Sequence, residues 1–208
     1  VSNAAFPFRS FRRMELGLVP ALVGRLTYTG GLGYEIWIKS DYQLALYDLI
    51  LREGAAFGLK LFGGRALNSL RLEKSWGSWA REYRPIYGPF EAGLDPFVDL
   101  KKNGFVGRDA ALRERDQGPK RRLTTFVVDA RDADVIGDEP VWHDGRVVGW
   151  ITSGGYAHHV GKSVALGYVP AEIAGAEGGF EIEIIGERRK AVPVARPLYD
   201  PDGRAMRG

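Results

Sequence analysis

A carboxylate that follows a glycine-rich bend is the feature of this sequence most suited to chemistry. Three glycines occupy four positions in residues 30–33, and Glu35 follows the last of them by two residues. Glycine permits positive φ and lets the backbone approach another group closely. A carboxylate can accept two parallel hydrogen bonds from a planar group with adjacent N–H donors, such as the amide and amino edge of a pterin. The residues alone favour a plainer interpretation, a β-hairpin with a glycine turn and an exposed glutamate.

Two strands and two helices are expected to position this bend. Alternating side chains predict strands over residues 24–28 and 34–38. Apolar residues at helical spacing predict a helix over 40–54, capped by a serine or aspartate and closed by a glycine. A short strand over 59–62 and a second helix over 63–74 follow. Strand, helix, strand and helix with short connections indicate half of a split βαβ layer.

The middle of the chain is irregular. Residues 75–105 are rich in Pro, Gly and aromatic side chains, which is typical either of a bridging layer between domains or of a ligand wall. The bridge is the favoured interpretation. Residues 107–117 then predict a short amphipathic helix that Gly118 ends.

The last third of the chain has the pattern of a small β domain. Period-two alternation and glycine turns argue for an antiparallel barrel or Greek-key domain. The predicted strands are 123–128, 146–151, 163–169, 180–185 and 189–195.

Composition excludes several classes of function. The chain has 208 residues, a formal charge of +3 and no cysteine, so a disulfide framework and a thiol nucleophile are excluded. The charge is too small to argue for nucleic acid, and no apolar run reaches the roughly 20 residues that span a bilayer. His158 and His159 are adjacent, so on a strand they cannot bind one metal together. No P-loop or dinucleotide fingerprint is present, and Ser153 lacks the context of a nucleophile elbow.

Several ordered blocks of the sequence resemble a known family. They are YTGGLGYEIWI at 28–38, GRALNSLRLEKSWGSWAREYRP at 64–85 with the stretch that continues to 112, and TSGGYAHHVGKSVALGYV at 152–169. Together they resemble the folate-binding aminomethyltransferases, which include the glycine cleavage T-protein. Within that family, the block NSLRLEKSWGSWAREYRP is more similar to the C-terminal half of dimethylglycine and sarcosine dehydrogenases.

The resemblance implies an α+β fold in two parts and a connection between them. Residues 1–74 would be the C-terminal part of the folate-binding split-βαβ domain, 75–118 a connecting segment with a short helix, and 119–208 the C-terminal β-barrel domain. The start at Val1 resembles an internal stretch of the family, so we expect a C-terminal piece of a longer polypeptide whose missing strands lie upstream.

The resemblance also implies a site. Tetrahydrofolate would be held by Tyr28, Glu35 and Tyr199, with Glu35 on the pterin edge and Tyr28 packed on the ring. The aspartate that assists proton transfer in the family would lie upstream of Val1. No catalytic residue and no metal ligand is therefore expected within these residues, and the isolated fragment is expected to be incomplete as an enzyme.

Two positions depart from the pattern of the family. Gly31 stands where the family usually has glutamate, and Leu67 stands where the T-protein has arginine. Arg65 lies about 200° round the helix from Leu67 and is a poor substitute, whereas Arg71 persists and is expected to pair with a carboxylate. A T-protein must recognise an aminomethyl-lipoyl arm, so the loss of that arginine favours a dehydrogenase-type parent.

The function implied is transfer of a one-carbon unit from an N-methyl amine, as an iminium, to tetrahydrofolate. FAD would belong only to an upstream flavin domain of the same parent chain. The other partners would be folate and a small N-methyl amine, with neither nucleic acid nor membrane. The expected location is the cytoplasm, or the mitochondrial matrix in a eukaryote. A stand-alone aminomethyltransferase and a non-catalytic folate-binding module remain as alternatives.

Overall fold

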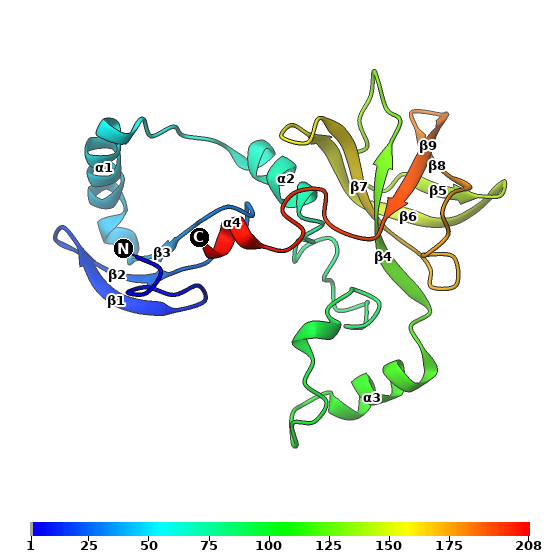
Figure 1. The fold of residues 1–208 in the computed structure, drawn as a ribbon, viewed down its shortest axis with the longest axis horizontal. Helices are drawn as coiled ribbons and strands as arrows, with labels where there is room; N and C mark the ends of the chain where they lie inside the picture. The colour runs from blue at the N-terminus through cyan, green and yellow to red at the C-terminus, as the bar shows by residue number, and fades with distance from the viewer. Residues whose placement is uncertain (1) are drawn as a thin grey trace. The chain divides into compact units, whose positions relative to one another are not determined.

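The computed structural model describes residues 2–208, and these form two compact units (Figure 1). One unit contains the chain up to Leu70 together with the C-terminal residues Asp200–Gly208. The other unit contains Arg71–Tyr199. The α+β fold expected from the sequence is confirmed, with a mixed sheet-and-helix unit and a closed antiparallel barrel.

The first unit is built on a three-stranded antiparallel sheet in the order β1-β2-β3. Its strands are β1 (Phe11–Leu16), β2 (Val19–Gly24) and β3 (Glu35–Trp37). Gly17 and Leu18 connect β1 to β2, and the left-handed φ of 63° at Gly17 is one that glycine adopts without strain. The sequence pattern did not reveal this first hairpin.

The predicted hairpin around the glycine bend exists, but its first strand was misplaced. β2 ends at Gly24 and residues 25–34 form a loop, so the strand predicted over 24–28 is wrong. The backbone of Arg25 still pairs with Arg9 and Ser10. Beyond it, the Thr27 hydroxyl accepts from the amides of Thr29 and Gly30, so these residues form a turn in place of a ladder.

One face of the sheet is covered and carries the core of the unit. Phe6, Ala21 and Val23 are buried there, and Met14, Leu16, Tyr34, Ile36 and Ile38 pack against them. A 3-10 turn, Ser40–Tyr42, leads into α1 (Gln43–Gly54), which confirms the first predicted helix. The C-terminal helix α4 (Arg204–Arg207) belongs to the same unit.

The strand predicted over 59–62 is wrong. After the 3-10 turn Ala55–Phe57, residues 59–62 are irregular and exposed, and no strand of the described residues pairs with them. A short apolar run cannot by itself distinguish a strand from a loop. The second predicted helix is confirmed as α2 (Gly64–Glu73), whose last three residues belong to the second unit.

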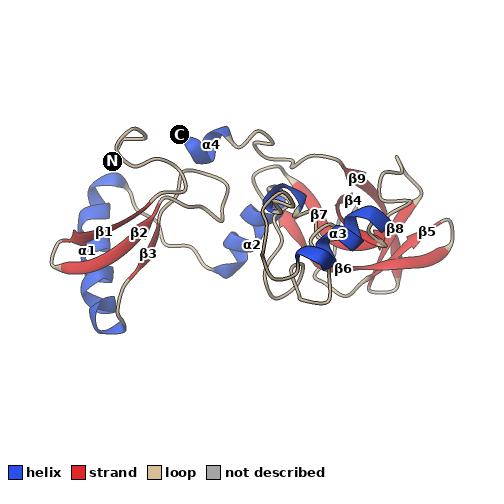
Figure 2. Ribbon diagram, turned by 90° about the horizontal axis from the view of Figure 1, so that it is seen from below, coloured by secondary structure: helices blue, strands red, loops and turns tan. Residues whose placement is uncertain are grey.

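A closed barrel of six antiparallel strands forms the centre of the second unit (Figure 2). Five strands were predicted, and the missed one is β5, a four-residue strand that begins with proline. The strands close in the order β4-β7-β6-β5-β8-β9 and are β4 (Arg121–Val128), β5 (Pro140–His143), β6 (Arg146–Ala157), β7 (Lys162–Pro170), β8 (Phe180–Ile184) and β9 (Glu187–Val194).

The interior of the barrel is apolar. Phe126, Val141, Ile151, Phe180 and Ile182 are each at most 1% exposed and come from four different strands. The side-chain alternation that predicted the strands therefore identifies the residues that fill the barrel.

The segment between α2 and the barrel packs on the barrel wall. It contains the 3-10 turn Asp95–Phe97 and the predicted helix, α3 (Arg108–Gln117). The ring of Tyr87 stacks on Tyr168 of β7 at 3.9 Å, and the amide of Leu123 donates to the carbonyl of Glu91. None of the helices in the described residues is long and apolar enough to cross a membrane.

Candidate functional site

The loop that carries Tyr28 is held by one threonine hydroxyl. The Thr27 hydroxyl accepts hydrogen bonds at 3.2 Å from the amides of Thr29 and Gly30, and Gly30 has a φ of 87°. Such side-chain-to-backbone bonds fix a turn without a sheet ladder. The loop then closes on itself, because the α-carbon of Gly33 lies next to the carbonyl of Leu26.

Replacing Gly33 by alanine is therefore expected to open this loop. A Cβ at Gly33 would lie 2.7 Å from the carbonyl oxygen of Leu26 and 2.9 Å from the Cβ of Thr27. We expect a loss of about 1–3 kcal/mol in the free energy of unfolding, measured by urea titration. Gly31 is the matched control, since a Cβ there meets nothing within 4 Å and Gly31→Ala should change stability by less than about 0.5 kcal/mol. Equal effects of the two substitutions would contradict this account of the loop.

Glu35 lies on the open face of the sheet, opposite the core of its unit. In antiparallel pairs, directly opposed residues share a face. Gly24 opposes both Phe11 and Glu35, and Leu22 opposes Trp37 one row further along. The open face thus places the Glu35 carboxylate in a row with Phe11 and Gly24.

Two aromatic rings flank this carboxylate. Phe11 and Trp37 stack at 5.7 Å with an interplanar angle of 30°, and both rings reach over Gly24, where a Cβ would lie 2.7 Å from Phe11 and 2.9 Å from Trp37. Both rings are about half exposed. Because Gly24 has no side chain, the pair forms a flat apolar surface beside Glu35.

The Glu35 carboxylate is exposed and has no hydrogen-bond or ion-pair partner among residues 2–208. It lines none of the three cavities described for the two units. A groove of about 600 Å³ begins one row along the same sheet, with Leu22 and Trp37 in its lining. Both oxygens of Glu35 are thus available to a planar donor pair.

Tyr199, the third predicted binding residue, belongs to the second unit. Its amide donates to the carbonyl of Glu73 at 3.0 Å, and its ring meets the ring of His159 edge-on at 4.8 Å. The Lys74 ammonium lies 5.7 Å from the ring of Tyr199 and 5.4 Å from the ring of Trp76. Tyr28 lies in the loop 25–34 of the first unit, and Glu35 begins β3 directly after that loop, whereas Tyr199 belongs to the second unit.

His158 and His159 lie in the turn after β6 and not on a strand, which corrects the sequence interpretation. The amide of His159 donates to Oε1 of Glu73 at 2.8 Å. No group of three or more His, Asp or Glu side chains able to hold a metal ion occurs in the part of the chain that is described.

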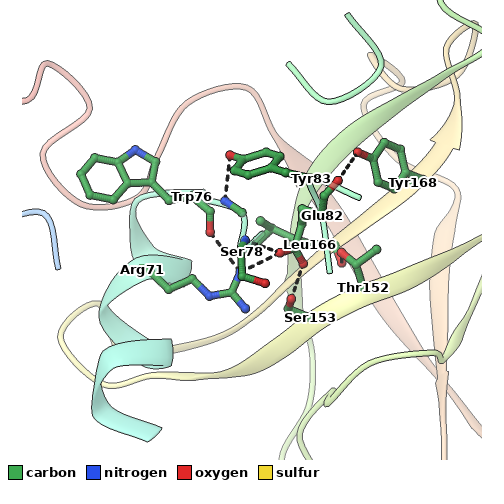
Figure 3. Close-up of polar contacts among 10 residues, drawn as sticks. Arg71, Trp76, Ser78, Glu82, Tyr83, Thr152, Ser153, Leu166 and Tyr168 are labelled. Carbon is green, nitrogen blue, oxygen red and sulfur yellow. Dashed lines mark hydrogen bonds and ion pairs between the residues drawn. The ribbon is translucent and has the colours of Figure 1, made fainter. Parts of the chain in front are cut away.

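A buried carboxylate, Glu82, fixes the segment that carries Trp76 (Figure 3). Its Oε2 accepts from the amide of Ser78 at 2.6 Å and from the guanidinium of Arg71 at 3.2 Å, and its Oε1 accepts from the hydroxyl of Ser153. Arg71 also donates to the carbonyl of Trp76 at 3.0 Å. The predicted pairing of Arg71 with a carboxylate is confirmed, and the partner follows it by eleven residues.

A β-bulge in the barrel brings Ser153 to this carboxylate. The register between β6 and β7 shifts between Ile151 and Ser153, so that the consecutive residues Thr152 and Ser153 are both buried. The Thr152 hydroxyl donates to the carbonyl of Leu166 at 3.0 Å. Bulges commonly redirect a side chain in this way. The alternation of side chains in the sequence does not reveal them.

Hydrogen bonding keeps Glu82 ionised. Burial alone would raise the pKa of Glu82, but the hydrogen bonds from Ser153 and Ser78 and the charge of Arg71 outweigh it and hold the pKa below the ordinary value of 4.5. Burial raises the pKa of Tyr168, whose hydroxyl donates to the carbonyl of Glu82 at 2.7 Å. Tyr168 therefore stays a neutral donor.

Replacing Tyr168 by phenylalanine removes that donor and leaves the carbonyl of Glu82 unsatisfied in a buried place. We expect the free energy of unfolding to fall by about 1–3 kcal/mol, as measured by urea titration at pH 7. Tyr156→Phe on β6 is the control, because that side chain is 42% exposed. A Tyr168→Phe protein as stable as the parent would show that the bond contributes nothing.

The closed barrel and the attached sheet unit define a known class of α+β protein. A solved structure of the same class is the crystal structure of glycine cleavage system aminomethyltransferase T from Bartonella henselae, with a TM-score of 0.85. At 24% identity over 97% of this chain and 55% of that one, the likeness shows the fold.

Sequence comparison identifies the family within that class. Residues 1–102 match the GCVT N-terminal domain, and residues 121–200 match the glycine cleavage T-protein C-terminal barrel domain. The chain belongs to the glycine cleavage T-protein family of aminomethyltransferases.

Two relatives are similar to nearly the whole of this chain. Dimethylglycine dehydrogenase, mitochondrial, of Homo sapiens is 36% identical over 95% of this chain, and the pyruvate dehydrogenase phosphatase regulatory subunit, mitochondrial, of Mus musculus is 32% identical over 93%. The match covers 23% of the first relative and 24% of the second, so the chain spans about a quarter of their length. The resemblance to the C-terminal part of the dehydrogenases is confirmed.

Proposed function

We propose that this chain is the tetrahydrofolate-binding portion of an aminomethyltransferase of the dimethylglycine or sarcosine dehydrogenase type. The observation that carries the proposal is Glu35, a carboxylate without a partner among residues 2–208, beside the stacked rings of Phe11 and Trp37. Family membership supports tetrahydrofolate as the planar ligand.

The proposal gives each predicted residue a distinct task. Glu35 accepts two hydrogen bonds from the amino and amide edge of the pterin. Tyr28 packs against the ring from the glycine loop. The family resemblance gives Tyr199, which contacts Glu73, His159 and Lys74, as a third residue that binds the ligand.

The reaction is a one-carbon transfer from an N-methyl amine. When bound, tetrahydrofolate supplies the amine that accepts the carbon. The residues of this chain hold and orient the ligand, which lowers the entropic part of the barrier. The family resemblance assigns proton transfer to an aspartate, and amine oxidation to a flavin, both in parts of the relatives that this chain does not span.

Two other functions are distinguished by specific observations. A stand-alone aminomethyltransferase is favoured by the fold of the Bartonella henselae protein, but Leu67 stands where the T-protein motif has arginine, which argues against it. A non-catalytic module is favoured by the likeness to a regulatory subunit. The mitochondrial dehydrogenase relative supports the matrix as the location in a eukaryote.

Calorimetric titration with tetrahydrofolate, followed by an assay of formaldehyde capture, tests the proposal. We expect binding of tetrahydrofolate by the intact parent protein and little turnover by the 208 residues alone. Absence of binding to the intact parent protein would refute the folate function. Rapid turnover would show that an acid/base group lies within these residues, and binding without turnover in the intact parent protein would favour the regulatory module.

A further inference from the structure

A groove of about 850 Å³ lies in the second unit, between the barrel and the segment that Glu82 holds. Trp76 and Tyr83 belong to that segment, and the opposite wall contains Thr124 and Thr125 of β4. Its volume is within the range of about 300–1,000 Å³ typical of small-molecule sites. None of the three residues predicted to bind the pterin lines it.

The charged side chains that line this groove are all cationic. They are Lys74, Arg122 and Arg196, and no Asp or Glu is part of the lining. Arg122 is exposed, and its guanidinium has no hydrogen-bond or ion-pair partner in the described chain, residues 2–208. An unpaired guanidinium in a groove without acids favours an anion, and its planar fork matches a carboxylate.

Aromatic rings stand among these cations. Trp76, Tyr83 and Phe97 line the groove, and Phe97 is 71% exposed. Tyr83 is fixed, since its hydroxyl accepts from the amide of Gly77 at 3.0 Å. Aromatic rings beside cations bind a flat ring that carries negative charge, by stacking on one part and ion pairing on the other.

We propose that this groove binds an aromatic ring bearing carboxylates, with p-aminobenzoyl-glutamate as the type of ligand. The ring packs on Trp76 and Phe97, and the carboxylates pair with Arg122 and Arg196. Two sources share this chemistry, the tail of the folate itself and a separate aromatic acid. The first source rests on the proposed function, and the second does not.

Calorimetric titration of the chain with p-aminobenzoyl-glutamate tests the groove directly. We expect saturable binding that is about tenfold weaker in Arg122→Gln/Arg196→Gln, because each charge-assisted hydrogen bond contributes measurably. Arg131→Gln/Arg146→Gln is the matched control, since it removes the same two charges from exposed side chains of the same unit, outside the groove, and should leave the affinity unchanged. No binding, or equal affinity in all variants, would overturn the proposal.

Competition then identifies the source of the ligand. If tetrahydrofolate displaces p-aminobenzoyl-glutamate and is weakened by the double substitution, the groove holds the folate tail. If both ligands bind at once, the groove belongs to a separate aromatic acid. Binding of tetrahydrofolate that depends on Glu35 but not on Arg122 and Arg196, without binding of p-aminobenzoyl-glutamate, would leave the proposed function intact and refute the groove.

Discussion

Glu82→Gln is expected to lower the free energy of unfolding by about 3–5 kcal/mol at pH 7, because Arg71 would be left as a buried charge without its counter-ion. Both side chains are nearly inaccessible, with exposed fractions of 5% for Arg71 and 0% for Glu82. Urea titration measures the effect. A second variant, Arg71→Met/Glu82→Gln, removes both charges and should be more stable than the single variant.

The matched control is an ion pair at the surface of the same unit. Arg81 and Asp138 lie 3.3 Å apart, with side chains 52% and 82% exposed. Asp138→Asn should cost less than about 1 kcal/mol, since solvent screens exposed pairs. A similar cost for the buried and the exposed pair would contradict the role given to Glu82.

The same carboxylate predicts a dependence on pH. The pKa of Glu82 is held below its ordinary value of 4.5, so the ionised form stabilises the folded state above that value. This contribution is lost as the pH falls below 4.5 and through the folded-state pKa. The difference in free energy of unfolding between the parent and Glu82→Gln should therefore be constant near pH 7 and shrink below pH 4.5.

Glu35→Gln is expected to weaken tetrahydrofolate binding about 100-fold, or about 2.7 kcal/mol, because hydrogen bonds to a charged group contribute about 1.5–3 kcal/mol. The amide of glutamine offers one acceptor and places its own N–H groups against the second donor. Calorimetry measures the affinity. The fold should be unaffected, since Glu35 is exposed and without a partner in the described residues.

Glu15→Gln is the control for this prediction. Glu15 lies on β1, on the same open face of the sheet two rows away, and is likewise exposed. The Glu15→Gln protein should bind tetrahydrofolate with the affinity of the parent. Equal weakening by Glu15→Gln would mean that the negative charge of the sheet, and not the position of Glu35, determines affinity.

The sequence predicted the strands and helices that depend on a local pattern of side chains. Period-two alternation located five of the six barrel strands, and helical spacing located α1, α2 and α3. The prediction failed where a contact with a residue far away in the chain determines the structure. The fully buried Arg25 side chain, next to Gly24, donates to the carbonyls of Phe6 and Arg207, which no local pattern reveals.

The candidate site was predicted in part for the same reason. Glu35 was found because a glycine bend and a carboxylate are adjacent in the sequence. Phe11 was missed, because only the register of β1 on β2 places it in the row of Glu35. Glu82 was missed because the bulge at Thr152 and the pairing with Arg71 bring together residues that are far apart in the chain.

The most direct test pairs the Glu35 substitution with a change in the ligand. Tetrahydrofolate and its 2-desamino-2-methyl analogue, which lacks the amino donor, are titrated against the parent protein and Glu35→Gln. If Glu35 binds the pterin edge, loss of the amino group should weaken binding to the parent by at least about tenfold and to Glu35→Gln very little. Equal, additive losses in both proteins would show that the carboxylate and the pterin edge do not touch.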